Sequence, residues 1–255
     1  MLTLNYKSFG QGPALLILHG LFGSLDNWAS LAKQFGEEFS VYLIDQRNHG
    51  RSPHTDEWNY GLMAEDLHDF MDQHGIMQAH LLGHSMGGKT VMTFAGEYPE
   101  RIDKLIVADM GIRQYPPHHE EVLKAIAAVP LDTLVSRQQA EEIISAHLDD
   151  QGVIQFLLKS LGRDEEKRFR WKFNFEVISQ HYQEVLAPLS MPFPFEGPTL
   201  FLTGVNSHYV RPEDHDSILM WFPQARFEAI ADAGHWLHAD QPEAFQMSVA
   251  SFLEE

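Results

Sequence analysis

The chain has 255 residues, of which 44% are hydrophobic and 21% are charged, enough to bury the core of a globular domain. Its 36 acidic and 18 basic residues give a formal net charge of −18, which disfavours general binding to nucleic acids or to anionic membrane surfaces. The chain has no cysteine, so disulfides, thiolate metal sites and cysteine nucleophiles are excluded.

The N-terminal segment, residues 1–12, has no apolar stretch behind a basic one and no small-residue cleavage site, so we expect no signal peptide. The longest apolar runs, such as residues 14–18, are much shorter than a membrane span. A chain without cysteine suits a reducing compartment. We therefore expect a cytoplasmic protein with no membrane partner.

Short apolar runs alternate with longer segments of helical period, which predicts an α/β fold with a mostly parallel sheet flanked by helices. The predicted strands, in chain order, are residues 2–9, 14–18, 41–44, 79–82, 104–108, 199–202 and 226–230. The predicted helices of this sheet are residues 27–35, 60–74, 86–98 and 240–253.

Between the fifth and sixth predicted strands, the strand signal disappears and helical periodicity replaces it. Helices are predicted at residues 119–129, 132–149, 151–161 and 173–186, and a proline-rich stretch, residues 188–198, follows them. A helical block of this size predicts a cap over the strand ends and not a loop. We therefore expect a core made of residues 1–110 and 198–255, and a helical cap made of residues 111–197.

The most informative motif is Gly83-His84-Ser85-Met86-Gly87, which follows a predicted buried strand and opens a predicted helix. The glycines permit a turn so tight that side chains flanking the serine would collide. The serine hydroxyl is then exposed at the positive end of the helix, in a strained backbone conformation. This context predicts Ser85 as a nucleophile.

Several motifs in the same order resemble the α/β-hydrolase superfamily over essentially the whole chain. Residues 19–24, His-Gly-Leu-Phe-Gly-Ser, resemble its oxyanion loop, and residues 45–52 resemble its D-x-R-x-H-G-x-S segment. With Gly-His-Ser-Met-Gly-Gly-Lys at residues 83–89, they resemble the bacterial YbfF-type esterases and their animal relatives. The resemblance implies activity on short-chain esters and acyl-CoA thioesters.

A tetrahedral intermediate requires two N–H donors near the nucleophile. We predict the backbone N–H of Met86 as one donor and that of Leu21 as the other, with Phe22 next in line. In the chain order of these hydrolases, the base precedes the last helix, which predicts His235 and leaves His238 as the alternative.

The acid departs from the commonest family pattern, because Asn206 occupies the place after the strand that follows the cap. A neutral amide cannot stabilise an imidazolium, so we predict Asp109, at the end of the preceding strand, as the acid. The resemblance to YbfF-type esterases implies the same residue. Asp214 and Asp216 are the alternatives, and capping the first cap helix is the other role open to Asp109.

The substrate is expected to contact apolar residues of the core and cap. The predicted substrate-binding residues are Phe22, Met86, Phe156, Trp171, Tyr209 and Trp236. Cap aromatics at helical spacing also commonly form the core of the cap itself. Residues 159–172 carry six basic and three acidic residues. This indicates either a solvent-exposed edge of the cap with local ion pairs or a binding site for the phosphates of coenzyme A.

These features together predict a serine carboxylesterase or thioesterase that acts on small acyl esters, and on acyl-CoA thioesters, through an acyl-enzyme. Acyl transfer of this kind requires no cofactor or metal, and His118 and His119 lack acids at metal-ligand spacing, so we expect neither. The alternatives are a cofactor-free carbon–carbon lyase of the menaquinone-pathway type on the same scaffold, and a non-enzymatic binding module.

Overall fold

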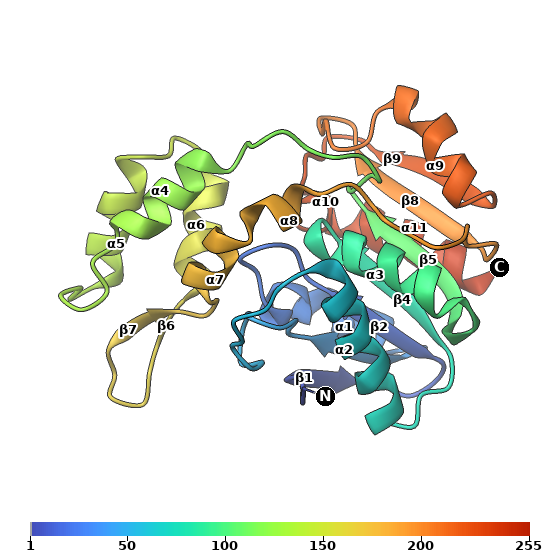
Figure 1. Ribbon diagram of the computed structural model, residues 1–255, viewed down its shortest axis with the longest axis horizontal. Helices are drawn as coiled ribbons and strands as arrows, with labels where there is room; N and C mark the ends of the chain where they lie inside the picture. Colours follow the sequence, from blue (N-terminus) through green and yellow to red (C-terminus); the bar gives the residue numbers. More distant parts are fainter. Residues whose placement is uncertain (1) are drawn as a thin grey trace.

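A seven-stranded sheet with the order β1-β3-β2-β4-β5-β8-β9 runs through residues 2–255, the part of the chain that the computed structural model describes (Figure 1). β1 is antiparallel to β3, and all other neighbouring strands are parallel. The strands are β1 (Tyr6–Phe9), β2 (Ala14–Leu18), β3 (Ser40–Ile44), β4 (Ala79–His84), β5 (Ile102–Ala108), β8 (Thr199–Gly204) and β9 (Ala225–Ile230). The predicted α/β fold with a mostly parallel sheet is confirmed.

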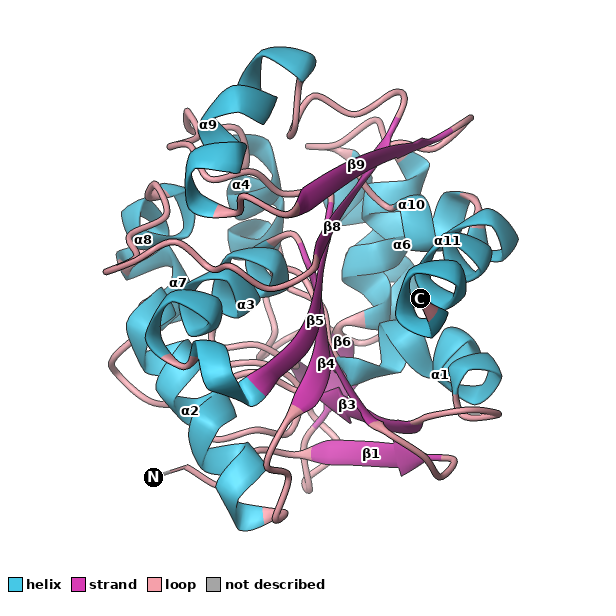
Figure 2. Cartoon of the chain, turned by 90° about the vertical axis from the view of Figure 1, so that its right-hand side faces the viewer, coloured by secondary structure: helices cyan, strands magenta, loops and turns pink. Residues whose placement is uncertain are grey.

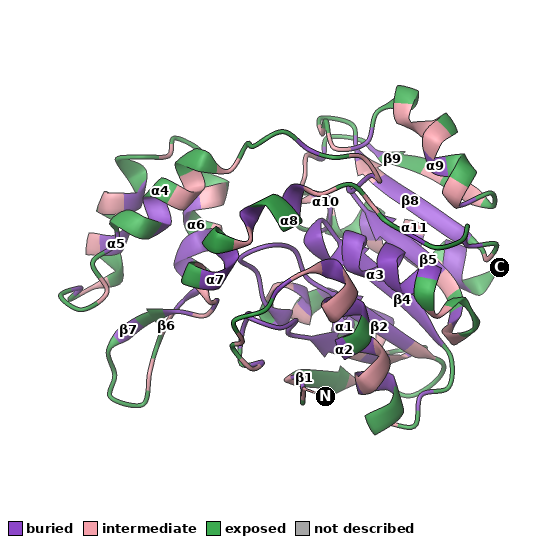
Figure 3. Cartoon of the chain, in the orientation of Figure 1, coloured by how far each residue is buried: buried purple, intermediate pink, exposed green. Residues whose placement is uncertain are grey.

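Helices cover both faces of this sheet (Figure 2). On one face lie α2 (Tyr60–Gln73), α3 (Met86–Glu97) and α9 (His215–Trp221), and on the other lie α1 (Ala29–Phe35), α10 (Leu237–Asp240) and α11 (Pro242–Glu254). Because both faces are covered, the central strand β4 is buried along its whole length (Figure 3). The short apolar runs of the sequence are therefore core strands.

Residues 111–197, here named the cap segment, lie between β5 and β8 in the chain and form a group of helices beside the sheet (Figure 1). The helices are α4 (Glu120–Ala128), α5 (Arg137–Ser145), α6 (Gln151–Lys159), α7 (Phe175–Gln180) and α8 (Tyr182–Leu186). The segment also contains an antiparallel hairpin of β6 (Leu161–Arg163) and β7 (Phe169–Trp171).

The hairpin is a difference from the helices that the sequence predicts in this segment. Its strands have three residues each, so they are too short to give an alternating pattern. The predicted helix at residues 132–149 also shrinks to α5, because Ser136 caps a new N-terminus by accepting the N–H of Gln139 at 3.1 Å.

The chain enters and leaves the cap segment along two adjacent stretches, residues 112–115 and 186–189, here named the cap connections. The N–H of Leu189 donates to the carbonyl of Ile112 at 2.7 Å, and the N–H of Tyr115 donates to that of Leu186 at 3.0 Å. Elsewhere the cap segment contacts the core where the Ser160 hydroxyl donates to the Phe22 carbonyl at 2.7 Å.

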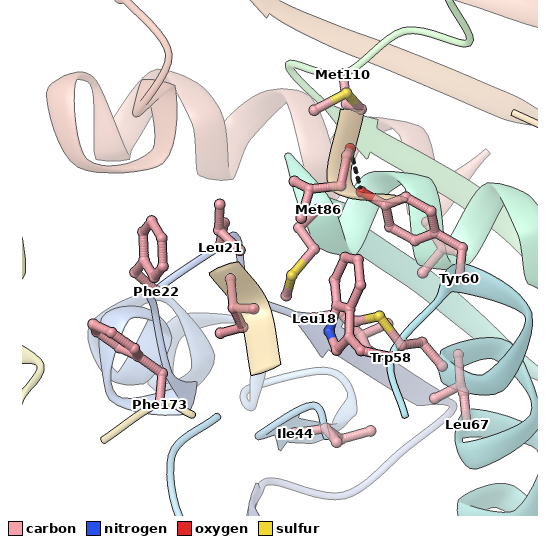
Figure 4. Close-up of a cluster of buried hydrophobic side chains, with 14 of the residues drawn as sticks. Leu18, Leu21, Phe22, Ile44, Trp58, Tyr60, Leu67, Met86, Met110 and Phe173 are labelled. Carbon is pink, nitrogen blue, oxygen red and sulfur yellow. Dashed lines mark hydrogen bonds between the residues drawn. The ribbon is translucent and has the colours of Figure 1, made fainter. Parts of the chain in front are cut away.

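Apolar side chains from the sheet, from α2, from the loops above them and from the cap segment form one continuous cluster (Figure 4). Leu18 and Ile44 come from strands, and Leu67 comes from α2. Figure 4 shows Leu21 and Met86 in the middle of this cluster, with Met110 above them. None of the described helices is long and apolar enough to cross a membrane.

Candidate active site

Ser85 lies in the turn between β4 and α3, with φ 53° and ψ −117°. A Cβ atom on Gly83 would lie 2.2 Å from the carbonyl oxygen of Gly87, and one on Gly87 would lie 2.5 Å from that of Leu18. Only glycine fits at either position. The turn therefore holds Ser85 in a conformation that is rare for residues other than glycine, at the N-terminus of α3.

The structure brings Ser85, His235 and Asp109 together in one hydrogen-bonded row. The Ser85 hydroxyl lies 3.0 Å from Nε2 of His235, and Nδ1 of His235 lies 2.7 Å from Oδ2 of Asp109. Ser85 follows β4, Asp109 follows β5, and His235 lies in the loop after β9. The three residues meet because parallel strands present their carboxyl ends at one edge of the sheet.

Asp109 is fully buried, with φ 49°, and three donors surround its carboxylate. Besides His235, the Ser207 hydroxyl donates to Oδ2 at 2.5 Å and the Gly204 N–H donates to Oδ1 at 3.3 Å. Burial raises the pKa of Asp109 to about 6, while the Ser207 hydrogen bond acts in the opposite direction. Sequence reasoning missed Ser207, because one serine in a polar loop carries no pattern.

The alternative acids and base do not join this row. The side chain of Asn206 is exposed, and the backbone N–H of Asn206 donates to the Ala233 carbonyl at 2.9 Å. Asp214 accepts the N–H of Arg211 at 2.9 Å, and Asp216 is exposed. His238 stacks on Trp28 with ring centroids 4.2 Å apart, and it makes no hydrogen bond to Ser85 or Asp109 in the described chain.

The imidazole of His235 is held from two further sides. The backbone carbonyl of His235 lies 2.8 Å from Nε2 of His84, and the imidazole ring stacks on Tyr209 with centroids 3.9 Å apart and planes 15° apart. Burial lowers the pKa of His235 to about 3, and nearby His118 adds to the decrease. The ring is therefore neutral at neutral pH and able to accept a proton from Ser85.

Two backbone N–H groups beside Ser85, those of Leu21 and Met86, donate to no other group within residues 2–255. The loop of Leu21 approaches closely because a Cβ on Gly20 would lie only 3.2 Å from Cβ of Ser85. In contrast, the N–H of Phe22 donates to Nε2 of His49 at 3.3 Å. In the described chain, the N–H groups of Leu21 and Met86 are thus unpaired beside Ser85, whereas that of Phe22 is engaged by His49.

A narrow cavity of about 10 Å³ lies beside Ser85, room for about one water molecule. Of the predicted substrate-binding residues, Met86 and Tyr209 line it. The other lining residues are Leu21, Tyr60, Met110, Tyr115, His118, His119, Val185 and Leu186. Sequence reasoning did not select most of these residues, because they lie in loops and cap connections whose fold the sequence pattern does not determine.

Four predicted substrate-binding residues do not line this cavity. Phe22 packs against Phe173 with ring centroids 4.8 Å apart, and Figure 4 shows Leu21 between Phe22 and Met86. Trp171 stacks on the other side of this contact, 5.3 Å from Phe173. Phe156 contacts Trp236 at 5.7 Å. These aromatics fill the contact between the cap segment and the core.

The two histidines at the start of α4 face tyrosine hydroxyls. Nδ1 of His118 donates to the Pro116 carbonyl at 2.7 Å, so its Nε2 accepts from the Tyr209 hydroxyl at 2.6 Å. Nδ1 of His119 lies 3.0 Å from the Tyr182 hydroxyl. Within residues 2–255, no three His, Asp or Glu side chains converge in a way that could hold a metal ion.

The basic stretch at residues 159–172 forms the β6–β7 hairpin, which projects away from the sheet (Figure 1). Arg168 pairs with Asp164 at 2.8 Å and with Glu166 at 2.9 Å. Arg170 is exposed and pairs with no carboxylate in the described chain. None of the residues 159–172 lines the cavity.

Residues 13–151 match the alpha/beta hydrolase fold family. The chain is 40% identical to the esterase YbfF of Escherichia coli, over 94% of this chain and 93% of that protein. It is 39% identical to the sn-1-specific diacylglycerol lipase of Mus musculus, over 94% of this chain and 81% of that protein. A solved marine microorganism esterase superposes with a TM-score of 0.96 at 39% identity, covering 99% of this chain and all of that one.

Proposed function

The chain belongs to the alpha/beta hydrolase fold family, among the YbfF-type esterases, and on this premise we propose that it hydrolyses small acyl esters through Ser85, His235 and Asp109. The observation that carries the proposal is the hydrogen-bonded row from the Ser85 hydroxyl through His235 to the buried carboxylate of Asp109. A nucleophile, a neutral base and a group that orients the base are the parts that acyl transfer requires.

The reaction proceeds in two halves. His235 takes the proton of Ser85 as the serine oxygen attacks the ester carbonyl, and the N–H groups of Leu21 and Met86 hold the resulting oxyanion. His235 then protonates the departing alcohol, which leaves an acyl-enzyme on Ser85. Water, deprotonated by His235, releases the acid and regenerates the serine. Asp109 keeps the imidazole in the tautomer with a proton on Nδ1 and stabilises the imidazolium.

The substrate proposed is an ester with a small, apolar acyl group. The cavity wall beside Ser85 is mainly apolar, since Leu21, Met86 and Met110 lie on the core side and Val185 and Leu186 on the cap side. Its small volume favours short acyl chains. We further propose that residues 111–197 act as the cap that sets this selectivity, over a core of residues 1–110 and 198–255, and that the protein is cytoplasmic.

Hydrolysis of acyl-CoA thioesters is a second proposal, which the β6–β7 hairpin supports. Arg170 is an exposed cation without a carboxylate partner in the described chain, on a surface that is acidic overall. Such a cation can pair with the phosphates of the coenzyme A part of a substrate. The same triad attacks a thioester as readily in principle as an oxyester, because the nucleophile and oxyanion donors are unchanged.

The proposal is tested with p-nitrophenyl esters of increasing acyl length, with acyl-CoAs and with a fluorophosphonate probe. We expect hydrolysis of the short esters, covalent labelling of Ser85, and a loss of about 10⁶ in kcat in folded Ser85→Ala. Near-normal turnover by Ser85→Ala would contradict the assignment. Elimination on a dicarboxylate substrate without ester cleavage would favour the lyase, and absence of labelling would favour a binding module.

A further inference from the structure

Lys89 lies one turn after Ser85 on α3 and is completely buried. Its ammonium group donates to the carbonyl of Arg113 at 3.2 Å and also to the carbonyl of Ala187. It lies over the rings of Tyr115, 5.1 Å from the centroid, and Tyr60, at 5.9 Å. No carboxylate of the described chain pairs with it. A buried ammonium without a counter-ion is costly, so its position calls for an explanation beyond packing.

The two carbonyl oxygens that Lys89 binds belong to different cap connections. Arg113 lies on the stretch that enters the cap segment, and Ala187 lies on the stretch that leaves it. Backbone hydrogen bonds also join these stretches to each other, from Leu189 to Ile112 and from Tyr115 to Leu186. Lys89 is therefore a bridge from the rigid core helix to both connections at once. Burial, and then the charge of Arg113, lower the pKa of Lys89 to about 8.

The same connections supply part of the cavity wall. Tyr115 lies on the entering connection, and Leu186 lies on the leaving one, next to Val185. Tyr60 completes this wall from the core, because its hydroxyl donates to the Val185 carbonyl at 3.0 Å. Tyr60 and Tyr115 contact Lys89 and line the cavity, whereas Lys89 itself does not line it, so the lysine acts through these neighbours and not on substrate directly.

We propose that Lys89 is a positioning residue that fixes both cap connections to α3 and so sets the width of the acyl cavity beside Ser85. This rests on the proposed ester hydrolysis. Without the lysine donors, the connections can move apart from α3, and longer acyl chains enter. The nucleophile, base and oxyanion donors lie on the core and keep their geometry.

The kinetic test compares p-nitrophenyl acetate with p-nitrophenyl octanoate in Lys89→Met, which retains the length of the side chain but no donor. We expect KM for the acetate to rise about tenfold, kcat to stay within about threefold, and the preference for acetate over octanoate to shrink about tenfold. Lys89→Arg, which keeps the charge and the donors, should recover part of the preference. Should Lys89→Met not fold, Lys89→Gln, with a shorter neutral amide, takes its place with a smaller shift in the same direction.

Val91→Ala is the matched control, since Val91 is equally buried on α3 and does not bond to the cap connections. It should lower the melting temperature without changing the acyl preference. An acyl preference in Lys89→Met equal to that of wild type, or changed only as in Val91→Ala, would overturn the proposal.

Amide hydrogen exchange tests the bridge independently of catalysis. The N–H groups of Tyr115 and Leu189 pair across the connections, so they should exchange at least about tenfold faster in Lys89→Met and not in Val91→Ala. Unchanged exchange would overturn the bridge even if the enzyme is active. Faster exchange in a protein that hydrolyses no ester would instead retain the bridge and reject the proposed function.

Discussion

At the scale of single residues, the carboxylate of Asp109 decides how His235 is oriented. It faces Nδ1 of His235 at 2.7 Å, whereas the side chain of Asn206 is exposed to solvent. Asp109→Asn should therefore lower kcat by about 10⁴, because an amide can hold the wrong imidazole tautomer and cannot stabilise an imidazolium. Asn206→Ala should cost less than about threefold. Both are measured as kcat on folded protein with one short ester.

The reverse order of the two losses would move the acid away from Asp109. Circular dichroism of each variant serves as the control for folding, since Asp109 is fully buried and an uncharged replacement changes its surroundings.

The Ser207 hydrogen bond lowers the pKa of the Asp109 carboxyl, against the larger upward effect of burial. The pKa of Asp109 is about 6, so activity should fall as the pH decreases through this value and the carboxyl gains a proton. A hydrogen bond to the charged form lowers a carboxyl pKa, so removing it in Ser207→Ala should move the acidic limb of kcat/KM to higher pH. The pH–rate profile measures this shift. Ser207→Thr keeps the hydroxyl and should keep the limb, and an unmoved limb in Ser207→Ala would contradict the role.

At the scale of elements, the β6–β7 hairpin separates two arginines that the sequence treats alike. Arg168 pairs with two carboxylates, and Arg170 pairs with none in the described chain. Arg170→Ala should raise KM for butyryl-CoA by about threefold to tenfold and leave KM for p-nitrophenyl butyrate unchanged, because only the former carries phosphates. Arg168→Ala is the matched control and should change both little. Equal effects on both substrates would make the hairpin a solvated edge.

The elements of the sheet could be predicted because buried parallel strands are short continuous apolar runs, as in β2 and β4. The residues that end these strands could be located with them, so Ser85 and Asp109 follow from the strand pattern and His235 from chain order. The hairpin and the cavity wall could not, because three-residue strands and loop side chains such as Tyr115 have no periodic signal. Phe22 and Trp171 lie outside this cavity wall, because apolar character in a sequence does not distinguish a cavity wall from an interface.

At the scale of the whole molecule, buried histidines set the response to acid. His19, His49, His84 and His238 are all more than nine-tenths buried, and burial lowers the pKa of each below 6.5, to about 4 for His19 and about 3 for His49 and His84. Below pH 6.5 these groups bind protons in the unfolded chain but stay neutral in the fold, so stability is lost as the pH falls. At pH 5.5 each costs about 1.4 kcal/mol.

Four such groups together are comparable with a typical free energy of unfolding of about 5–15 kcal/mol, so the protein should be close to unfolding near pH 5. Asp109, Asp66 and Glu97 oppose this trend, because burial raises the pKa of each carboxyl above its ordinary value. Urea unfolding at pH 7.5, 6.5 and 5.5 measures the loss. His238→Phe keeps a ring against Trp28 and should flatten the dependence, whereas exposed His147→Asn should not. Equal unfolding midpoints at pH 7.5 and 5.5 would contradict the prediction.

The adjacency of the two cap connections has a consequence for how such a protein can change over evolutionary time. Because the chain leaves and re-enters the core at neighbouring points, joined by the Leu189–Ile112 hydrogen bond, the intervening residues close a loop whose length matters little to the core. During evolution this insertion can therefore be lengthened, shortened or exchanged as a unit while the catalytic residues of the core stay unchanged. New substrate preferences can then arise without any change in the catalytic residues, provided that each insertion retains backbone carbonyls to which Lys89 can donate.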